Sequence, residues 1–259
     1  MIIGTKAKVG FGTETLREQE ILTEYLKEVS LYEYDFVDCA WRYGNEPYIG
    51  MALCNIKKAD MSFRFNVAFQ SKVWPSKFPG GVNKSLKFAL SKIGVNNYMD
   101  SYLLHAPADT IEKNITAWKQ LIDCQTRGQT KRIGLGDFTI EVMDALFEAT
   151  GRRPDVLQLP ISLGNIHFEY ISYCQENSIE LQSYRPLEGW EKYSGNKILV
   201  DLAAKYGTTI KNLISAFFLN LGITVILLPE SKGEIGELIE AKSLILSKED
   251  LDLIKSITQ

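Results

Sequence analysis

Short apolar stretches rich in β-branched and aromatic residues alternate with amphipathic helical stretches along the whole chain. Eight of these stretches predict strands, at residues 7–12, 35–39, 65–72, 101–105, 132–136, 156–160, 180–184 and 224–228. Most are separated by the length of one strand and one helix, roughly 30 residues. The wider gap before the last strand leaves room for two helices.

Helix boundaries are marked by capping residues and glycines. Thr15 and Glu18 have the spacing of a capping box, which predicts that the first helix begins there. Gly94 follows an apolar helical pattern and predicts its end. Ser247 and Asp250 predict the start of the final helix.

Strands joined by crossover helices run parallel, and eight of them close naturally into a (β/α)8 TIM barrel. No linker rich in Pro, Gly or Ser divides the chain, so residues 1–259 are expected to form one domain. An open doubly wound sheet is the alternative fold. It is less favoured because the glycine-rich fingerprint expected after its first strand is missing.

Composition narrows the class of protein. The chain has 259 residues, of which 45% are hydrophobic and 24% charged, and its formal net charge is −3. Such a chain can bury a large core and has no basic field for a nucleic acid. Residues 212–229 lack charge but include polar residues, which indicates core and no membrane span.

The N-terminus lacks the pattern of a signal peptide, and the four cysteines are scattered. With only two histidines to join those cysteines, no metal site is expected. We therefore expect a reduced cytoplasmic protein, a monomer or a weak homodimer, that acts on a small molecule.

Polar residues end three of the predicted strands: Asp38, Lys72 and His105. Tyr43 follows Asp38 in the next loop. In a barrel the carboxyl ends of the strands form the functional face, so these four side chains are expected to converge. An isolated strand-end Asp or His is usually a cap or a core residue, and only the set as a whole indicates a site.

The segment from Asp38 to Glu46, Asp-Cys-Ala-Trp-Arg-Tyr-Gly-Asn-Glu, resembles the first signature of the aldo-keto reductases. The intervals from Tyr43 to Lys72 and from Lys72 to His105 also match that family. The resemblance implies reversible hydride transfer from NADH or NADPH to an aldehyde or ketone. Tyr43 would donate the proton, Lys72 would lower the pKa of Tyr43, Asp38 would pair with Lys72, and His105 would orient the carbonyl.

The resemblance also implies cofactor contacts, with departures from the family pattern. The matched positions are Gly12, Thr13, Gly136, Asp137, Gln158, Tyr184 and Leu187. Gln158 would hold the nicotinamide carboxamide, and Tyr184 would stack on the ring. Gly136 and Asp137 replace the family's Ser-Asn pair, and a carboxylate cannot donate to the carboxamide oxygen.

A second departure follows the last strand. Glu230 and Ser231 stand where the family has Lys-Ser, and the place of the arginine that grips the 2′-phosphate of NADPH falls near Gly236. Because Glu230 would repel a phosphate, we expect NADH to be accepted at least as well as NADPH unless Lys232 turns in.

Substrate contacts are harder to predict. Trp41, Trp74 and Trp190 are candidates for an apolar cup at the mouth of the barrel. His167 and Arg185 could contact an acidic group, although a surface role is the simpler interpretation. Two other functions stay open: a Schiff-base aldolase that uses Lys72, and a regulatory or catalytically divergent relative that binds the cofactor.

Overall fold

The computed structural model describes residues 7–63, 65–94 and 97–258. Residues 1–6, on which the expected lack of a signal peptide depends, lie outside the described residues. Within the described ranges, no helix has the length and apolar character needed to cross a membrane.

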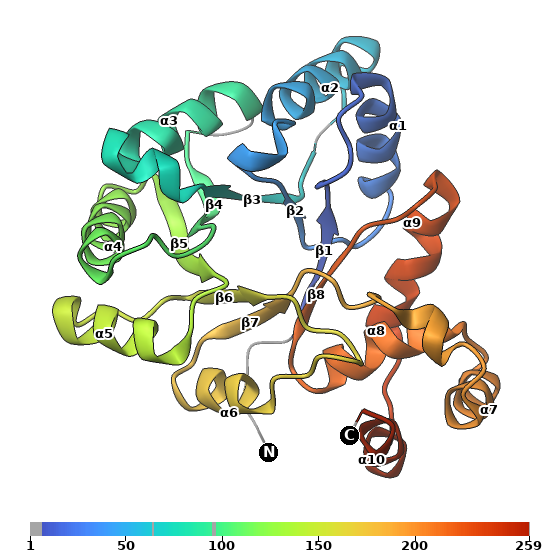
Figure 1. Ribbon diagram of the computed structural model, residues 1–259. Coiled ribbons are helices and arrows are strands. Elements are labelled where there is room, and N and C mark those ends of the chain that lie inside the picture. Colours follow the sequence, from blue (N-terminus) through green and yellow to red (C-terminus); the bar gives the residue numbers. More distant parts are fainter. Residues whose placement is uncertain (1–6, 64, 95–96, 259) are drawn as a thin grey trace.

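Eight parallel strands form a closed barrel (Figure 1) in which each strand pairs with the next and β8 pairs with β1. The strands are β1 Val9–Gly12, β2 Phe36–Asp38, β3 Ala68–Val73, β4 Met99–Leu104, β5 Thr130–Gly136, β6 Val156–Leu159, β7 Glu180–Ser183 and β8 Thr224–Leu227. The predicted (β/α)8 barrel is confirmed. Strand ends differ by a few residues, most of all in β3, which begins at Ala68 and not at the predicted Phe65.

Helices surround the barrel (Figure 1). They are α1 Gln19–Val29, α2 Glu46–Ala59, α3 Val82–Ile93, α4 Ile111–Thr126, α5 Ile140–Thr150, α6 Phe168–Glu176, α7 Lys197–Tyr206, α8 Ile210–Asn220, α9 Lys232–Ile239 and α10 Lys248–Ser256. Short 3₁₀ helices are η1 Trp41–Tyr43, η2 Pro75–Gly80, η3 Trp190–Tyr193 and η4 Glu240–Ser243. Both α7 and α8 lie in the wide gap between β7 and β8, as predicted.

The capping box predicted at Thr15 is wrong. Helix α1 begins at Gln19, and Glu18 is its N-cap without a side-chain cap. The β1–α1 loop is therefore longer than expected. The prediction for the last helix is confirmed, because the Ser247 side chain accepts a hydrogen bond from the Asp250 backbone nitrogen.

Apolar side chains of the helices pack on the outside of the barrel. In α1, Leu22, Leu26 and Val29 are buried at helical spacing and form part of one continuous core. Trp118 of α4 is fully buried, and its indole nitrogen donates to the Arg152 carbonyl at 3.1 Å. The strand register sets Asp38 beside Gln70 and Gln158 beside Gln182, so that polar residues meet inside the barrel.

Candidate active site

Three predicted side chains meet at the carboxyl ends of β2 and β3. Lys72 Nζ donates to Asp38 Oδ2 at 2.5 Å and to the Tyr43 hydroxyl at 3.1 Å. A third hydrogen bond joins Lys72 Nζ to the Cys39 carbonyl oxygen at 3.2 Å. The side chain of Lys72 is 0% exposed and that of Asp38 2%. Burial of an ion pair is tolerated because each charge has partners that compensate for lost water.

The loop after β1 supports this cluster. The Thr13 hydroxyl donates to the Asp38 carbonyl oxygen at 2.8 Å, and Asn45 Nδ2 donates to the Thr13 carbonyl oxygen at 2.6 Å. Thr13 is fully buried, so its hydroxyl is committed to the backbone of β2. The expected contact of Gly12 and Thr13 with a cofactor stays a prediction.

His105 directly follows β4 and lies between two aromatic rings. Its ring centroid is 5.7 Å from that of Tyr43 and 5.0 Å from that of Trp74, and both pairs are nearly perpendicular. His105 Nδ1 is buried and has no hydrogen-bond partner within the part of the chain that the structure describes. Nε2 is therefore the nitrogen that remains to face the cavity.

The protonation states follow from burial. Burial raises the pKa of the Tyr43 phenol to about 12, although the Lys72 cation opposes the rise. Lys72 lowers this pKa, as expected, but burial outweighs Lys72 and the net pKa lies above the ordinary value of tyrosine. Burial, together with the positive charges of Lys72 and Arg42, lowers the pKa of His105 to about 3. The phenol is protonated and the imidazole neutral at physiological pH.

Burial alone would lower the pKa of Lys72, but Asp38 and Tyr43 hold it above its ordinary value. Lys72 is therefore a cation at every physiological pH. A permanent cation beside Tyr43 favours the phenolate that forms when the phenol gives up its proton.

Glutamine amides hold the other oxygen of Asp38. Gln70 Nε2 donates to Asp38 Oδ1 at 2.8 Å, and Gln158 Nε2 donates to the same oxygen at 3.2 Å. Both amides also donate to Gln182 Oε1, at 2.8 Å and 3.1 Å. The interior of such a barrel is usually filled by branched apolar side chains. Here a buried amide layer fixes the carboxylate that pairs with Lys72.

The hydrogen bonds continue toward the opposite end of the barrel. Gln182 Nε2 donates to Glu180 Oε1 at 2.9 Å. Glu180 pairs with Lys8 at 2.8 Å and with Arg132 at 3.0 Å. Burial opposes ionisation of Glu180, but these two cations outweigh it and lower its pKa. Gln70, Gln182 and Glu180 were not predicted as part of the site, although polar residues within buried strands were a usable signal.

A cavity of about 250 Å³ opens over Tyr43 and His105. Its walls also contain the predicted residues Trp74, Gly136, Asp137, Gln158, Tyr184 and Arg185. Glu14, Arg17 and Arg42 complete the lining and were not predicted. The phenol and the imidazole can therefore reach a small molecule, while Asp38 and Lys72 lie buried beneath them.

Asp137 and Tyr184 form one wall of this cavity. The Tyr184 hydroxyl donates to Asp137 Oδ1 at 3.2 Å, and burial raises the pKa of Asp137. The preceding residue has no room for a side chain, since a Cβ at Gly136 would lie 2.5 Å from the His105 carbonyl oxygen. Glycine at this position allows β5 to approach the residue that carries the imidazole.

A second cavity, of about 260 Å³, continues from the first and shares Glu14, Tyr184 and Arg185 with it. Leu187 and Leu228 also line the second cavity. The two cavities are therefore neighbours, and the second one lies along the loop after β7. Tyr184 and Leu187 both line the second cavity, and their expected contact with a cofactor stays a prediction.

The N-terminus of α9 is already occupied by a carboxylate. Glu234 Oε2 accepts from the Glu230 backbone nitrogen at 2.7 Å, and Glu234 Oε1 pairs with Lys211 at 2.8 Å. Glu230 is exposed, and Ser231 is the N-cap of α9 without a side-chain hydrogen bond of its own. A Cβ at Gly236 would lie 2.4 Å from the Tyr32 hydroxyl, so a larger residue there requires Tyr32 to move.

Only one of the three predicted tryptophans is among the described residues that line the catalytic cavity, and it is Trp74. The Trp41 ring lies under Lys77, whose Nζ is 4.4 Å from the ring centroid. Lys211 Nζ lies 5.0 Å from the Trp190 ring. A role of Trp41 and Trp190 in substrate binding stays a prediction.

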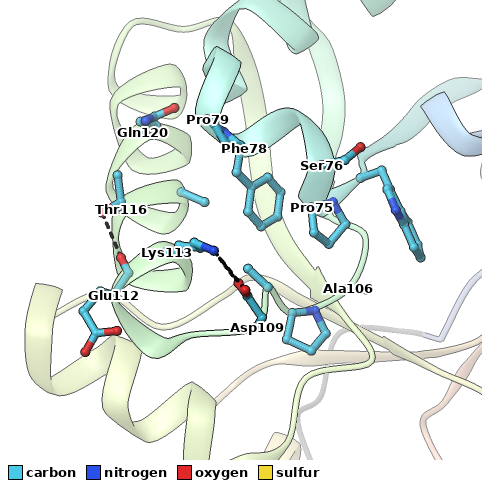
Figure 2. A pocket seen from close by; sticks show the side chains of 14 residues that line it. Pro75, Ser76, Phe78, Pro79, Ala106, Asp109, Glu112, Lys113, Thr116 and Gln120 are labelled. Atoms are coloured by element: carbon cyan, nitrogen blue, oxygen red, sulfur yellow. Dashed lines mark hydrogen bonds and ion pairs between the residues drawn. The ribbon is translucent and has the colours of Figure 1, made fainter.

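A larger cavity, of about 760 Å³, lies between η2 and α4 (Figure 2). Trp74 lines this cavity as well as the catalytic one. Its other walls are largely apolar and include Pro75, Phe78 and Ala117. Figure 2 shows Lys113 turned toward Asp109, with which it pairs at 2.8 Å.

No group of three or more His, Cys, Asp or Glu side chains that could hold a metal ion occurs among the described residues.

Comparisons with known proteins agree with this geometry. The chain is 28% identical over 255 residues to methylglyoxal reductase DkgA of Escherichia coli K12, covering 97% of this chain and 90% of the relative. It is 27% identical over 254 residues to the uncharacterized oxidoreductase YtbE of Bacillus subtilis, covering 96% and 88%. These relatives are oxidoreductases by name.

Solved structures share the fold. Aldose reductase from Schistosoma japonicum superposes with a TM-score of 0.85 at 22% identity, covering 96% of this chain and 87% of that one. A variant of Gox0644, solved in complex with NADPH, gives a TM-score of 0.85 at 21% identity, covering 96% and 89%. The model of the aldo/keto reductase family matches residues 1–259. The chain therefore belongs to the aldo/keto reductase family, and the predicted class, a nicotinamide-dependent oxidoreductase, is confirmed.

Proposed function

We propose that Tyr43 is the proton donor when the chain reduces the carbonyl group of an aldehyde or ketone with NADH or NADPH. The observation that carries this assignment is the 3.1 Å hydrogen bond between Lys72 Nζ and the Tyr43 hydroxyl, at the floor of an open cavity and beside His105. A phenol held by a buried cation and open to a cavity is a directed donor.

The nicotinamide, when bound, supplies the hydride. Negative charge then develops on the carbonyl oxygen, where the Tyr43 hydroxyl and the His105 Nε2–H meet it as two fixed donors. The pKa of Tyr43, raised to about 12, keeps its hydroxyl protonated at neutral pH, and the pKa of His105, lowered to about 3, leaves a neutral imidazole with one N–H to donate. Lys72 stabilises the phenolate left behind, and Asp38 balances the charge of Lys72.

The two cavities, which share Glu14, Tyr184 and Arg185, offer contacts for a nicotinamide cofactor. Gln158 Nε2 is committed to Asp38 and Gln182, so Gln158 Oε1 is the atom left to accept from a carboxamide nitrogen. Tyr184 offers an aromatic face beside the same cavity. Ionised Asp137 can also only accept, and the carboxamide oxygen then has no donor from this pair.

The charges near α9 favour NADH. Lys232 is paired with Glu28 at 3.4 Å and Lys211 with Glu234 at 2.8 Å, so neither cation is free for a 2′-phosphate. Glu230 adds a negative charge in the same segment. We expect NADH to bind at least as tightly as NADPH, measured by fluorescence titration, and Glu230→Lys to shift the ratio toward NADPH. A strong preference of the unaltered protein for NADPH contradicts this proposal.

The test of the catalytic assignment uses methylglyoxal, because the relative DkgA is named for its reduction. Oxidation of NADH and NADPH is followed by absorbance. Tyr43→Phe is expected to lower kcat at least about 100-fold while cofactor binding is kept. Tyr48→Phe, which alters an exposed tyrosine of α2, is the matched control. Equal activity of Tyr43→Phe and the control would refute the role of Tyr43.

The contact with Asp38 argues against the Schiff-base alternative. A nucleophilic lysine must be a neutral amine, whereas Lys72 is held as a cation at 2.5 Å from a carboxylate. Borohydride trapping of a carbonyl compound on Lys72 without nicotinamide would favour the aldolase. The regulatory alternative predicts cofactor binding without turnover of any carbonyl compound.

The monomeric or weakly dimeric state and the cytoplasmic location remain predictions.

A further inference from the structure

Three arginines stand around the mouth of the catalytic cavity: Arg17, Arg42 and Arg185. Arg185 pairs with Glu188 at 3.3 Å. Within residues 7–63, 65–94 and 97–258, Arg17 and Arg42 have no ion-pair partner. Cations left unpaired at the rim of a cleft attract anions into it.

Arg42 is held in place although it is exposed. Its guanidinium carbon lies 4.0 Å from the centroid of the Trp74 ring, and the Trp74 ring meets the His105 ring edge-on at 5.0 Å. Arg42 also directly precedes Tyr43 within η1. The guanidinium therefore lines the same cavity as Tyr43 and His105, and its charge contributes to the lowered pKa of His105.

Two other cations in the region, Lys113 and Arg185, are already paired with carboxylates. Lys113, in the larger cavity beyond Trp74, is paired with Asp109. Arg185 lies where the catalytic cavity joins the second cavity, the path proposed for the cofactor. The carboxylates on the same wall, Glu14 and Asp137, form no ion pair with Arg17 or Arg42 among the described residues.

We propose that the substrate carries an anionic group a few atoms from its carbonyl, and that Arg42, aided by Arg17, binds this anion. The inference rests on the proposed function and names the substrate class of the same site. The planar guanidinium binds carboxylate and phosphate through paired hydrogen bonds, so either anion fits. Arg42 sets specificity and gives up no proton in the reaction.

The test compares each acid with a neutral counterpart of the same carbon skeleton. Succinic semialdehyde is compared with its methyl ester, and glyceraldehyde phosphate with glyceraldehyde. A kcat/KM at least about tenfold higher for an anion than for its counterpart supports the proposal. The pair with the larger ratio identifies carboxylate or phosphate as the preferred group. The ratio should fall as salt is added, because screening weakens attraction to an exposed cation.

Three substitutions test whether the arginines cause the preference for an anionic substrate. Arg42→Gln should reduce the ratio of anion to neutral substrate at least about tenfold, and Arg17→Gln should reduce it less. Arg127→Gln removes an exposed arginine at the C-cap of α4 and should leave the ratio unchanged. If Arg42→Gln weakens NADH binding and leaves the ratio intact, the arginine serves the cofactor and the proposal is overturned.

A binding measurement tests the anion site even if the protein reduces none of these substrates. Calorimetry with hydroxybutanoate, the reduced form of the semialdehyde, is done on the protein with oxidised cofactor. Binding to the unaltered protein but not to Arg42→Gln supports the anion site even if the proposed reductase activity fails. Equal reduction of acid and ester, abolished in both cases by Tyr43→Phe, overturns the anion site and leaves the reductase proposal standing.

Discussion

Gln70 Nε2 lies 2.8 Å from Asp38 Oδ1, the carboxylate oxygen that Lys72 does not bind. One carboxylate oxygen of Asp38 thus accepts a hydrogen bond from the Lys72 cation, and the other accepts from glutamine amides. Since the Lys72 ammonium also holds Tyr43, the direction of the Tyr43 phenol depends on an amide one step deeper in the barrel. Gln70 acts through Asp38 and is a positioning residue.

Gln70→Leu should destabilise the protein, because it removes donors from buried Asp38 and Gln182 oxygens. Loss of hydrogen bonds to buried groups costs about 1–3 kcal/mol, more when the group is charged. In a chain of this size each kcal/mol lowers Tm by roughly 2–4 °C. Calorimetry measures Tm, with Gln175→Leu as an exposed control. A lower kcat with unchanged KM would show the positioning role, whereas kinetics identical to the control would contradict it.

Much of the fold could be predicted because the signal is local. Strand and helix periods appear within short windows, and closure of eight parallel strands follows from their number. The start of α1 could not be predicted in the same way. Thr15 and Glu18 have capping spacing, but the chain first runs as a loop in which Leu16 is buried, and α1 begins at Gln19.

The convergence of the proposed catalytic residues could be predicted from strand ends, whereas the buried amides that hold Asp38 could not. Tyr43, Lys72 and His105 each follow or end a strand, and all barrel strands end on one face. Gln70 and Gln182 are 112 residues apart in the chain and meet only because the barrel closes. The lowering of the Tyr43 pKa by Lys72 could be predicted from the spacing of the two residues, whereas the larger rise caused by burial could not.

The stability of the protein should fall below the ordinary pKa of histidine because His105 is buried as the neutral form. Its pKa is lowered from 6.5 to about 3. Between these two pH values the unfolded chain binds a proton that the folded chain does not. The free energy of unfolding therefore decreases as the pH falls, by up to about 1.4 kcal/mol per pH unit. Above this window the contribution is constant.

Tm measured against pH tests the effect with a matched pair of variants. His105→Gln should show a weaker loss of Tm on acidification than the unaltered protein. His167→Gln removes the other histidine, which is half-buried near Glu169, and should follow the unaltered protein. Parallel curves for all three proteins would contradict a neutral buried His105.

Asp137→Asn should tighten cofactor binding, because it supplies amide donors for the carboxamide oxygen. The Asn oxygen can still accept from the Tyr184 hydroxyl, which lies 3.2 Å from Asp137 Oδ1. One added hydrogen bond of about 1 kcal/mol corresponds to roughly fivefold in Kd for NADH. Fluorescence titration measures the Kd for NADH, with Asp123→Asn on α4 as control.

Because burial raises the pKa of Asp137, NADH should also bind more tightly to the unaltered protein as the pH falls. Weaker binding to Asp137→Asn contradicts the assigned contact.

Gly136→Ser restores the family's residue, yet it should lower both stability and activity in this chain. The added Cβ would lie 2.5 Å from the His105 carbonyl oxygen, and a backbone atom cannot turn away as a side chain can. Relief requires β4 and β5 to separate, which moves His105 relative to Tyr43. Overpacking of this kind costs about 1–3 kcal/mol. Gly195→Ser is the control, because a Cβ there meets nothing within 4 Å. If Tm and kcat of Gly136→Ser match those of the control, the close approach of β5 to His105 is not a constraint on the site.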